Sequence, residues 1–152
     1  MLTKGSKAPE FTLPNQQGEL VSLADFQQQR VVLYFYPKDD TPGCTAQACS
    51  YRDNKEAFDQ RNVAVLGVSV DDESSHVKFQ SKHNLNFTLL SDTNKEVVQA
   101  YGVWVEKSMY GKKYMGTART TFIINNGIIE EVFEKVDPKN DVDLVLAYLD
   151  KQ

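Results

Sequence analysis

The feature that most constrains this chain is the short run from Val31 to Tyr36, because every side chain in it is apolar or aromatic. A strand that is apolar on both faces of its pleat must be covered on each side, which is the situation of a central strand between layers of helices. Pro37 follows and ends the run, since proline cannot donate to a strand ladder. We therefore expect a sheet with two covered faces.

Strand-like and helix-like stretches alternate after this run. A second buried strand is predicted over residues 63–70, a polar helix over 73–83, and a short strand over 87–90. A capped helix is predicted to follow Ser91 and Asp92, whose side chains can accept hydrogen bonds from a helix start. The order β-α-β-α-β-α favours an α/β fold.

The carboxy-terminal part predicts a hairpin and a last helix. Residues 120–124 and 128–136 are joined by Asn125-Asn126-Gly127, and an Asn-Gly step is the strongest short signal for an antiparallel hairpin. Apolar residues in 140–149 suffice for a helix packed on the sheet. With a small hairpin over 11–23, the prediction is an α/β, thioredoxin-like mixed sheet flanked by helices, with an N-terminal hairpin.

Size and charge exclude several classes of protein. The 152 residues suit one domain over residues 1–152. The net charge is −4 and Lys and Arg are scattered among acids, which disfavours nucleic-acid binding. No stretch approaches eighteen consecutive apolar residues and the amino terminus lacks the apolar core of a signal peptide, so we expect a cytoplasmic protein without a membrane partner.

A metal or cofactor is not expected. His76 and His83 share one predicted helix, but the cysteines lie in another segment and no pair of ligands has the spacing of a metal site. The acids Asp71, Asp72 and Glu73 are explained as the start of that helix, where negative charge complements the helix dipole.

Cys44 is the candidate nucleophile. A breaker-rich loop runs from Pro37 to Gly43, and residues 44–60 contain neither Pro nor Gly, so Cys44 is expected in a first helical turn. Unpaired N–H groups and the positive end of the dipole favour a thiolate there. Thr41 offers a hydroxyl to a substrate oxygen, although its spacing equally suits a helix cap. A small buried hydrophobe remains the alternative for Cys44.

Cys49 lies five positions after Cys44. In an ideal helix their Cα atoms would be roughly 8–9 Å apart, on different faces. Disulfides need Cα separations below about 7 Å, so a bond between the two sulfurs requires the helix to unwind locally. An inert cysteine on the buried helix face is the alternative interpretation of Cys49.

The segment around Cys44 resembles the peroxidatic segment of the Q-type peroxiredoxins, also called bacterioferritin comigratory proteins. Residues 34–45 read Tyr-Phe-Tyr-Pro-Lys-Asp-Asp-Thr-Pro-Gly-Cys-Thr, a long contiguous match. The resemblance covers nearly the whole chain and continues through Gln47-Ala48-Cys49, Arg52-Asp53, Tyr101-Gly102-Val103-Trp104, Glu106-Lys107, Tyr110-Gly111-Lys112 and Arg119-Thr120-Thr121-Phe122.

This resemblance implies a thiol-dependent peroxidase with a thioredoxin-like fold. Pro37, Thr41, Cys44 and Arg119 are the implied peroxide site, and Cys49 is the implied resolving cysteine of the subgroup that keeps it. Attack on the O–O bond would leave a sulfenic acid on Cys44, and its condensation with Cys49 would give a disulfide. The implied partners are hydroperoxides and a dithiol reductant such as thioredoxin.

Two positions depart from the family's pattern. Gln47 stands where many relatives carry Glu, which affects local proton handling or capping, and Asn125-Asn126-Gly127 replaces a turn that commonly contains Asp. The chain ends at Gln152 without a carboxy-terminal cysteine. We therefore expect an intramolecular disulfide and a monomer.

Other interpretations remain open from the sequence. A thiol–disulfide oxidoreductase would normally carry Cys-x-x-Cys, and here four residues separate the cysteines. A redox-sensing or binding module would use oxidation of Cys44 to change a partner interface. Trp104, Tyr110 and Tyr114 lie in a stretch interpreted as loop-rich, where they either line a hydroperoxide entrance or simply pack.

Overall fold

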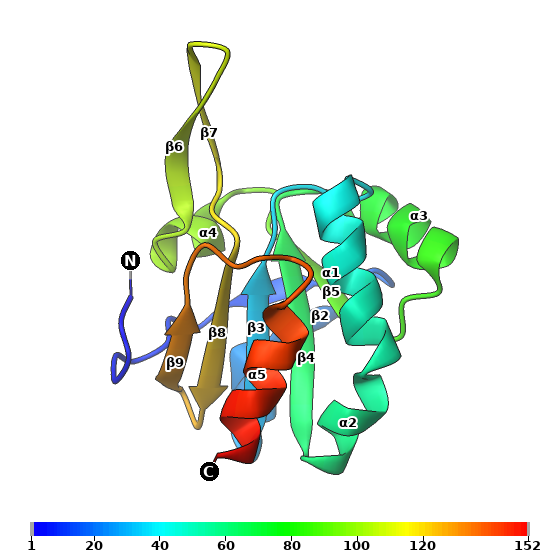
Figure 1. The fold of residues 1–152 in the computed structure, drawn as a ribbon, viewed down its shortest axis with the longest axis vertical. Helices are drawn as coiled ribbons and strands as arrows, with labels where there is room; N and C mark the ends of the chain where they lie inside the picture. The colour runs from blue at the N-terminus through cyan, green and yellow to red at the C-terminus, as the bar shows by residue number, and fades with distance from the viewer. Residues whose placement is uncertain (1, 152) are drawn as a thin grey trace.

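A computed structural model describes residues 2–151. Met1 and Gln152, which the expected domain of residues 1–152 includes, lie outside the described residues. The central sheet has five strands in the order β5-β4-β3-β8-β9. In Figure 1 these strands form one layer, with α1 and α5 in front of it. The strands are β3 (Arg30–Phe35), β4 (Val63–Ser69), β5 (Thr88–Ser91), β8 (Thr120–Asn125) and β9 (Ile128–Phe133).

The sheet is mixed, as predicted. Strand β3 pairs in parallel with β4 and antiparallel with β8, and β4 pairs in parallel with β5. Strand β9 closes the sheet by an antiparallel pairing with β8. Asn126 and Gly127 join these two strands with positive φ angles of 50° and 81°, the left-handed conformation that an Asn-Gly turn favours.

Strand β3 contributes to a hydrophobic core on each face of the sheet. Val31, Leu33 and Phe35 pack into one core, and Val32 and Tyr34 pack into the other, so side chains alternate between faces along the strand. All five are at most 1% exposed. The prediction of a strand covered on both faces is confirmed.

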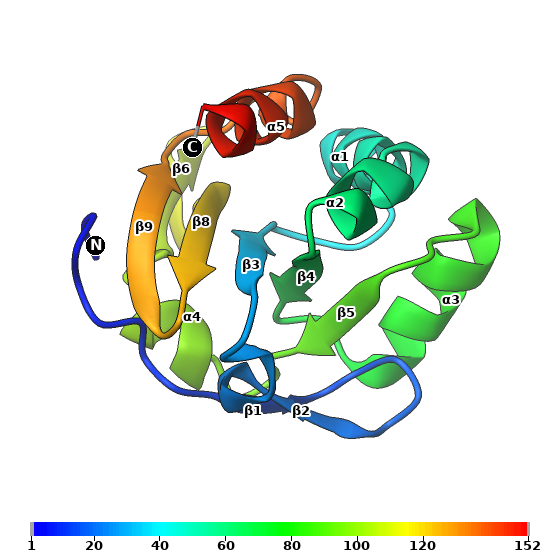
Figure 2. The ribbon, with the colours of Figure 1, turned by 90° about the horizontal axis from the view of Figure 1, so that it is seen from below.

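Helices and a hairpin supply the two covers, which Figure 2 shows above and below the sheet. The first core includes side chains from the small β1–β2 sheet and from α4, and the second includes side chains from α1, α2, α3 and α5. The bounds are β1 Thr12–Pro14, β2 Leu20–Ser22, a 3-10 turn Leu23–Phe26, α1 Pro42–Asp53, α2 Lys55–Gln60, α3 Glu73–His83, α4 Glu96–Ala100 and α5 Asp141–Asp150.

Three expected elements differ from the sequence analysis. The helix expected over 44–60 is divided at Asn54, whose side chain donates to the Ser50 carbonyl. The helix expected directly after Asp92 begins only at Glu96, after Lys95 takes a left-handed φ of 62°. The last sheet strand ends at Phe133 rather than at residue 136.

The stretch interpreted as loop-rich is an antiparallel hairpin, so that interpretation was wrong. Strands β6 (Trp104–Met109) and β7 (Lys112–Thr117) pair along their whole length. Tyr110 and Gly111 form the turn, with φ angles of 53° and 78°. Figure 1 shows the hairpin projecting away from the sheet. Its turn is Tyr-Gly rather than Asn-Gly, which hid the signal.

Within residues 2–151, no helix combines the length and the apolar character needed to cross a bilayer. His76 lies buried against Asp39 and His83 lies near Asp40, so the two histidines have different partners.

Candidate active site

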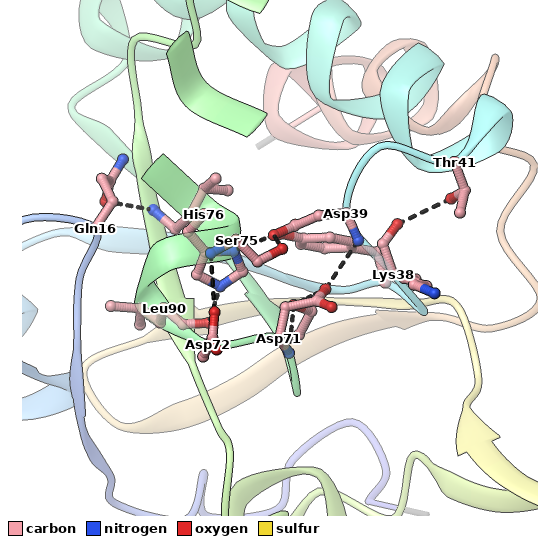
Figure 3. Close-up of polar contacts among 12 residues, drawn as sticks. Gln16, Lys38, Asp39, Thr41, Asp71, Asp72, Ser75, His76 and Leu90 are labelled. Carbon is pink, nitrogen blue, oxygen red and sulfur yellow. Dashed lines mark hydrogen bonds and ion pairs between the residues drawn. The ribbon is translucent and has the colours of Figure 1, made fainter. Parts of the chain in front are cut away.

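The loop from β3 to α1 carries Pro37 and Thr41. Pro37 follows the end of β3 and is half-buried, as is Thr41, which occupies the N-cap position of α1. The Thr41 hydroxyl donates to the Lys38 carbonyl oxygen at 2.9 Å (Figure 3) and accepts no cap hydrogen bond from the helix. Thr41 therefore holds the capping position while its hydroxyl oxygen stays available to another donor.

Cys44 lies in the first turn of α1, as predicted. Pro42 opens the helix, where its missing N–H is not needed. Cys44 is 1% exposed and carries a free thiol. Its sulfur lies at the helix end where backbone N–H groups have no partner within the helix, an environment that favours negative charge.

Arg119 is the cation that meets this sulfur. It comes directly before β8, and its Nη2 donates to the Cys44 sulfur at 3.5 Å. Gly43 makes this approach possible, because a Cβ at that position would lie 3.1 Å from the same Nη2. The structure thus brings Thr41, Cys44 and Arg119 to one end of α1.

A buried hydrogen-bond network holds the other side of Arg119. Its Nη1 donates to Gln47 Oε1 at 2.7 Å, and Gln47 Nε2 donates to Asp141 Oδ2 at 2.9 Å. Tyr51 and Thr121 donate to the same Asp141 oxygen, at 2.6 and 3.0 Å. Burial raises the pKa of Asp141 above its usual value, and hydrogen bonds from Tyr51, Gln47 and Thr121 oppose that rise.

A second cation, Lys107, lies near Arg119 and Cys44. Burial lowers the pKa of Lys107, the positive charge of Arg119 lowers it further, and negative charge on Cys44 opposes both. The Lys107 ammonium donates to the Thr117 carbonyl oxygen across the β6–β7 hairpin. Gly116 leaves room for the lysine stem, because a Cβ there would lie 3.2 Å from its Cδ.

The loop before Thr41 is fixed from α3 and from the end of β4. Asp39 is buried and accepts hydrogen bonds from Tyr36, Ser75 and His76, at 2.6, 2.8 and 2.6 Å. Its backbone N–H donates to Asp71, and Figure 3 shows these side chains gathered around it. The loop therefore has a defined conformation next to the site.

His76 is held between two acceptors, the Asp39 carboxylate and the Leu90 carbonyl at 3.0 Å. Burial lowers the pKa of His76, but its hydrogen bond and charge interaction with Asp39 outweigh burial, so that the pKa is raised above 6.5. An imidazolium donates from both ring nitrogens, which matches a site with two acceptors.

Cys49 lies farther along α1 and is partly exposed, with a free thiol. The helix is continuous from Pro42 to Asp53, so both cysteines lie on one unbroken helix. The geometric argument that their sulfurs cannot bond without unwinding applies to this helix. The structure does not bring Cys49 to the Cys44–Arg119 contact.

The aromatic residues considered for a hydroperoxide entrance are spread along the hairpin. Tyr110 is 98% exposed at its tip and Tyr114 is exposed on β7, while Trp104 packs partly against the first core. Lys95 lies over the Trp104 ring, with its ammonium 5.8 Å from the ring centre. The tip, where Tyr110 forms part of the turn, projects away from the sheet in Figure 1.

Sequence reasoning missed Asp141, Lys107 and the pair Asp39–His76. Asp141 begins a helix, where an acid is ordinarily explained by the dipole, and nothing local shows that it is 0% exposed. Gln47 was noticed as a departure, but its partners come from sequence positions far away. Lys107 could have been recognised as a site residue from the sequence, because it belongs to Glu106-Lys107, one of the segments that carry the family resemblance.

Sequence comparison finds relatives along most of the chain. The AhpC/TSA family matches residues 4–132. The protein named peroxiredoxin Bcp from Escherichia coli K12 is 50% identical over 149 residues, covering 97% of this chain and 96% of its own. Peroxiredoxin Bcp from Bacillus subtilis is 45% identical over 139 residues, covering 91% of this chain and 88% of its own.

Solved structures show the same fold. A cysteine-to-serine mutant of PrxQ from Xylella fastidiosa superposes with a TM-score of 0.94 at 32% identity, covering 99% of this chain and 97% of its own. The bacterioferritin comigratory protein of Xanthomonas campestris gives a TM-score of 0.88 at 34% identity, covering 93% of this chain and 90% of its own. That structure is described in terms of alkyl peroxide reduction. The prediction of a thioredoxin-like mixed sheet is confirmed.

Proposed function

This chain belongs to the AhpC/TSA family as a thiol-dependent peroxidase of the Q-type, or Bcp, peroxiredoxins, and we propose that Cys44 is the nucleophile of its reaction with hydroperoxides. The observation that carries the proposal is the 3.5 Å contact between Arg119 Nη2 and the Cys44 sulfur at the start of α1. A guanidinium and a helix start together favour the thiolate, which is the reactive form of a cysteine.

In the first step the Cys44 thiolate attacks the distal oxygen of the hydroperoxide. A sulfur–oxygen bond forms, the O–O bond breaks, and the electron pair leaves with the second oxygen, which takes a proton to become alcohol or water. Sulfur is oxidised to sulfenic acid while the peroxide is reduced. Arg119 offsets the charge that develops along the O–O axis, and the Thr41 hydroxyl oxygen accepts a hydrogen bond from the hydroperoxide O–H, whose proton stays on the oxygen that becomes the sulfenic acid.

Pro37 has a shaping role in this proposal. Its half-buried ring has no donor and lies two residues after the end of β3, and we assign it to limiting the access of water to the thiolate. Together with Thr41 and Arg119 it completes the proposed substrate site.

Resolution is proposed to use Cys49 of the same chain. Its thiolate attacks the Cys44 sulfenic sulfur, a disulfide forms, and hydroxide leaves and is protonated to water. The first turns of α1 unwind at this step because the folded helix keeps the cysteines apart. A cytoplasmic dithiol, which we take to be thioredoxin, then reduces the disulfide and is itself oxidised. The cycle needs no second subunit, so we propose a monomer.

Peroxide consumption with thioredoxin, thioredoxin reductase and NADPH tests the proposal. We expect sustained turnover by the wild-type protein and none by Cys44→Ser. Cys49→Ser is the matched variant on the same helix, and it should consume one peroxide per protein and then stop. Turnover by Cys44→Ser would overturn the assignment of the nucleophile, and normal turnover by Cys49→Ser would overturn the resolving role.

A further inference from the structure

Asp141 is a buried carboxyl group that accepts three hydrogen bonds on one oxygen. Gln47 and Tyr51 of α1 and Thr121 of β8 all donate to Oδ2, whereas Oδ1 has no hydrogen-bond partner within residues 2–151. When the carboxyl binds a proton, Oδ1 is the free position for it. Oδ2 therefore serves as an acceptor in either protonation state.

This acceptor fixes which way the Gln47 amide points. An amide has a donor end and an acceptor end, and a group that only accepts must face the donor end. Gln47 Nε2 lies 2.9 Å from Asp141, so Gln47 Oε1 is turned toward Arg119 Nη1 at 2.7 Å. The reversed amide would place N–H groups against the guanidinium and a carbonyl against the carboxylate.

Arg119 is in turn oriented by Gln47. A guanidinium is planar and its donors have fixed directions, so anchoring Nη1 sets where Nη2 points. Nη2 is the nitrogen that contacts the Cys44 sulfur, 3.5 Å away. A continuous series of hydrogen bonds thus runs from Asp141 through Gln47 and Arg119 to the thiol.

The same geometry accounts for Gln rather than Glu at position 47. A carboxylate there would face Asp141, and two buried carboxylates in contact cannot both be ionised without a large penalty. An amide supplies the acceptor that Arg119 needs and the donor that Asp141 needs. Gln47 and Asp141 are therefore a matched pair.

We propose that Asp141 is a positioning residue of the peroxidase, which holds Arg119 against Cys44 by fixing the orientation of the Gln47 amide. The proposal rests on the assignment of Cys44 as the nucleophile. Asp141 lies far from Cys44 in the sequence, and its carboxylate accepts hydrogen bonds from Gln47, Tyr51 and Thr121 rather than from the reacting thiol. Its effect is on the geometry of the guanidinium.

The test compares four variants in a Cys49→Ser background, where only the first step with hydrogen peroxide is observed. Asp141→Leu removes the acceptor and should slow sulfenic acid formation about 10- to 100-fold, as expected for a displaced catalytic group. Asp141→Asn can place its carbonyl oxygen at the Oδ2 position and should react at close to the unsubstituted rate. Equal rates for the Leu and unsubstituted proteins would overturn the proposal.

The second pair of variants tests the matching directly. Gln47→Glu should slow the reaction, and more so as pH rises and both carboxyl groups ionise, while Gln47→Glu with Asp141→Asn should regain the rate. The other titratable groups facing Asp141 are Arg119 beside β8, Tyr51 of α1 and Tyr34 of β3, and burial raises the pKa of both tyrosines well above 10. If the double variant forms sulfenic acid no faster than Gln47→Glu does, then Gln47 and Asp141 are not a matched pair.

Two controls separate this inference from the proposed function and from loss of folding. Circular dichroism and thermal unfolding identify a variant that does not fold. If Asp141→Leu does not fold, the recovery of the Gln47→Glu rate by adding Asp141→Asn still tests the inference. The pH titration of the Cys44 thiolate by ultraviolet absorbance, taken against Cys44→Ser, should shift in Asp141→Leu and not in Asp141→Asn. This readout does not depend on peroxide turnover, so an unchanged titration counts against the inference even if Cys44 is the nucleophile.

Discussion

Arg119 and His76 show how single side chains in this protein serve two partners at once. Arg119 donates to the Cys44 sulfur with one nitrogen and to Gln47 with the other. His76 faces the Asp39 carboxylate and the Leu90 carbonyl. In each case the side chain has donors in fixed directions, and a residue of equal charge but different shape cannot make both contacts.

Arg119→Lys should therefore be a severe change although it keeps the charge. A lysine ammonium is a point charge on a flexible stem and cannot hold Cys44 and Gln47 in the geometry of the planar fork. We expect sulfenic acid formation to slow about 10²-fold, the effect of losing one preorganised donor. Rapid-mixing measurements with hydrogen peroxide check this, with Arg61→Lys as a control because Arg61 pairs with exposed Asp150. A rate equal to that of the control would refute the role of the fork.

His76 should make stability depend on pH. Its pKa in the folded protein is raised above 6.5, so its contribution is fully present below about 6.5 and is lost as pH rises through the folded-state pKa. The free energy of unfolding should therefore decrease above about pH 6.5 in the wild type, and less so in His76→Gln. Urea unfolding at a series of pH values checks the difference. Parallel curves for the two proteins would show that His76 does not bind its proton more tightly on folding.

Helix α1 has two requirements that conflict. It must be folded to hold Cys44 in contact with Arg119, and it must open for Cys49 to reach Cys44. Its hydrogen bonds to Asp141, from Gln47 and Tyr51, favour the folded form. The break at Asn54 separates it from α2, so α1 can open while α2 stays packed through Phe58.

Oxidation should accordingly expose the first turns of α1 and little else. In the disulfide form we expect backbone amides around residues 44–49 to exchange rapidly with solvent, while amides of β3 keep their protection because both neighbours, β4 and β8, remain paired. Hydrogen exchange read by mass spectrometry, comparing reduced and oxidised protein, measures this. The Cys49→Ser variant treated with peroxide is the control. Full protection of α1 in the disulfide form would contradict local unwinding.

Strand β4 offers a test of packing within the sheet. A Cβ at Gly67 would lie 2.9 Å from Tyr34 Cζ and 3.1 Å from Leu89 Cδ2, and both side chains are buried. Gly67→Ala should destabilise the protein by about 1–3 kcal/mol, the usual effect of overpacking. Chemical denaturation gives the value. Adding Tyr34→Phe should not restore stability, because the ring carbon itself is in the way; recovery in the double variant would locate the conflict at the hydroxyl.

The whole molecule divides into a two-sided body and a projecting hairpin. The body packs one core on each face of the five-stranded sheet, and Figure 2 shows the sheet between them. The β6–β7 hairpin extends from this body, with Met109, Tyr110, Tyr114 and Met115 exposed. The Lys107 side chain of β6 reaches back to the carbonyl oxygen of Thr117 at the base of the hairpin, and its charge interacts with Arg119 and Cys44.

Substitutions should separate these two parts clearly. Tyr110→Ser at the tip removes a side chain that is 98% exposed and should change the free energy of unfolding by no more than about 0.5 kcal/mol. Leu33→Ala in β3 removes a fully buried side chain and should cost about 2–5 kcal/mol. Thermal and urea unfolding of both variants check the contrast. A large loss in Tyr110→Ser would mean that the tip is buried in solution.

Local patterns along the chain were enough to predict the strands of the central sheet, most helices and the position of Cys44. The run 31–36, apolar on both faces, and the Asn125-Asn126-Gly127 turn each act over a few residues, so they can be recognised without knowledge of the fold. The Tyr-Gly turn of β6–β7 was missed since Tyr rarely takes a positive φ.

The surroundings of the thiol, by contrast, exist only once the chain has folded. Gln47 meets residues 72 and 94 positions away, Arg119 and Asp141, and Asp39 meets His76 from 37 positions away. Such contacts leave no periodic trace in the sequence, because they arise when separate elements meet at one end of the strands of the central sheet. Burial raises the pKa of Asp141, and the Asp39 carboxylate raises the pKa of His76 against the effect of burial. Hydrogen bonds to Asp141 and Arg119 orient Gln47. Burial and these contacts are properties of the folded chain rather than of any segment.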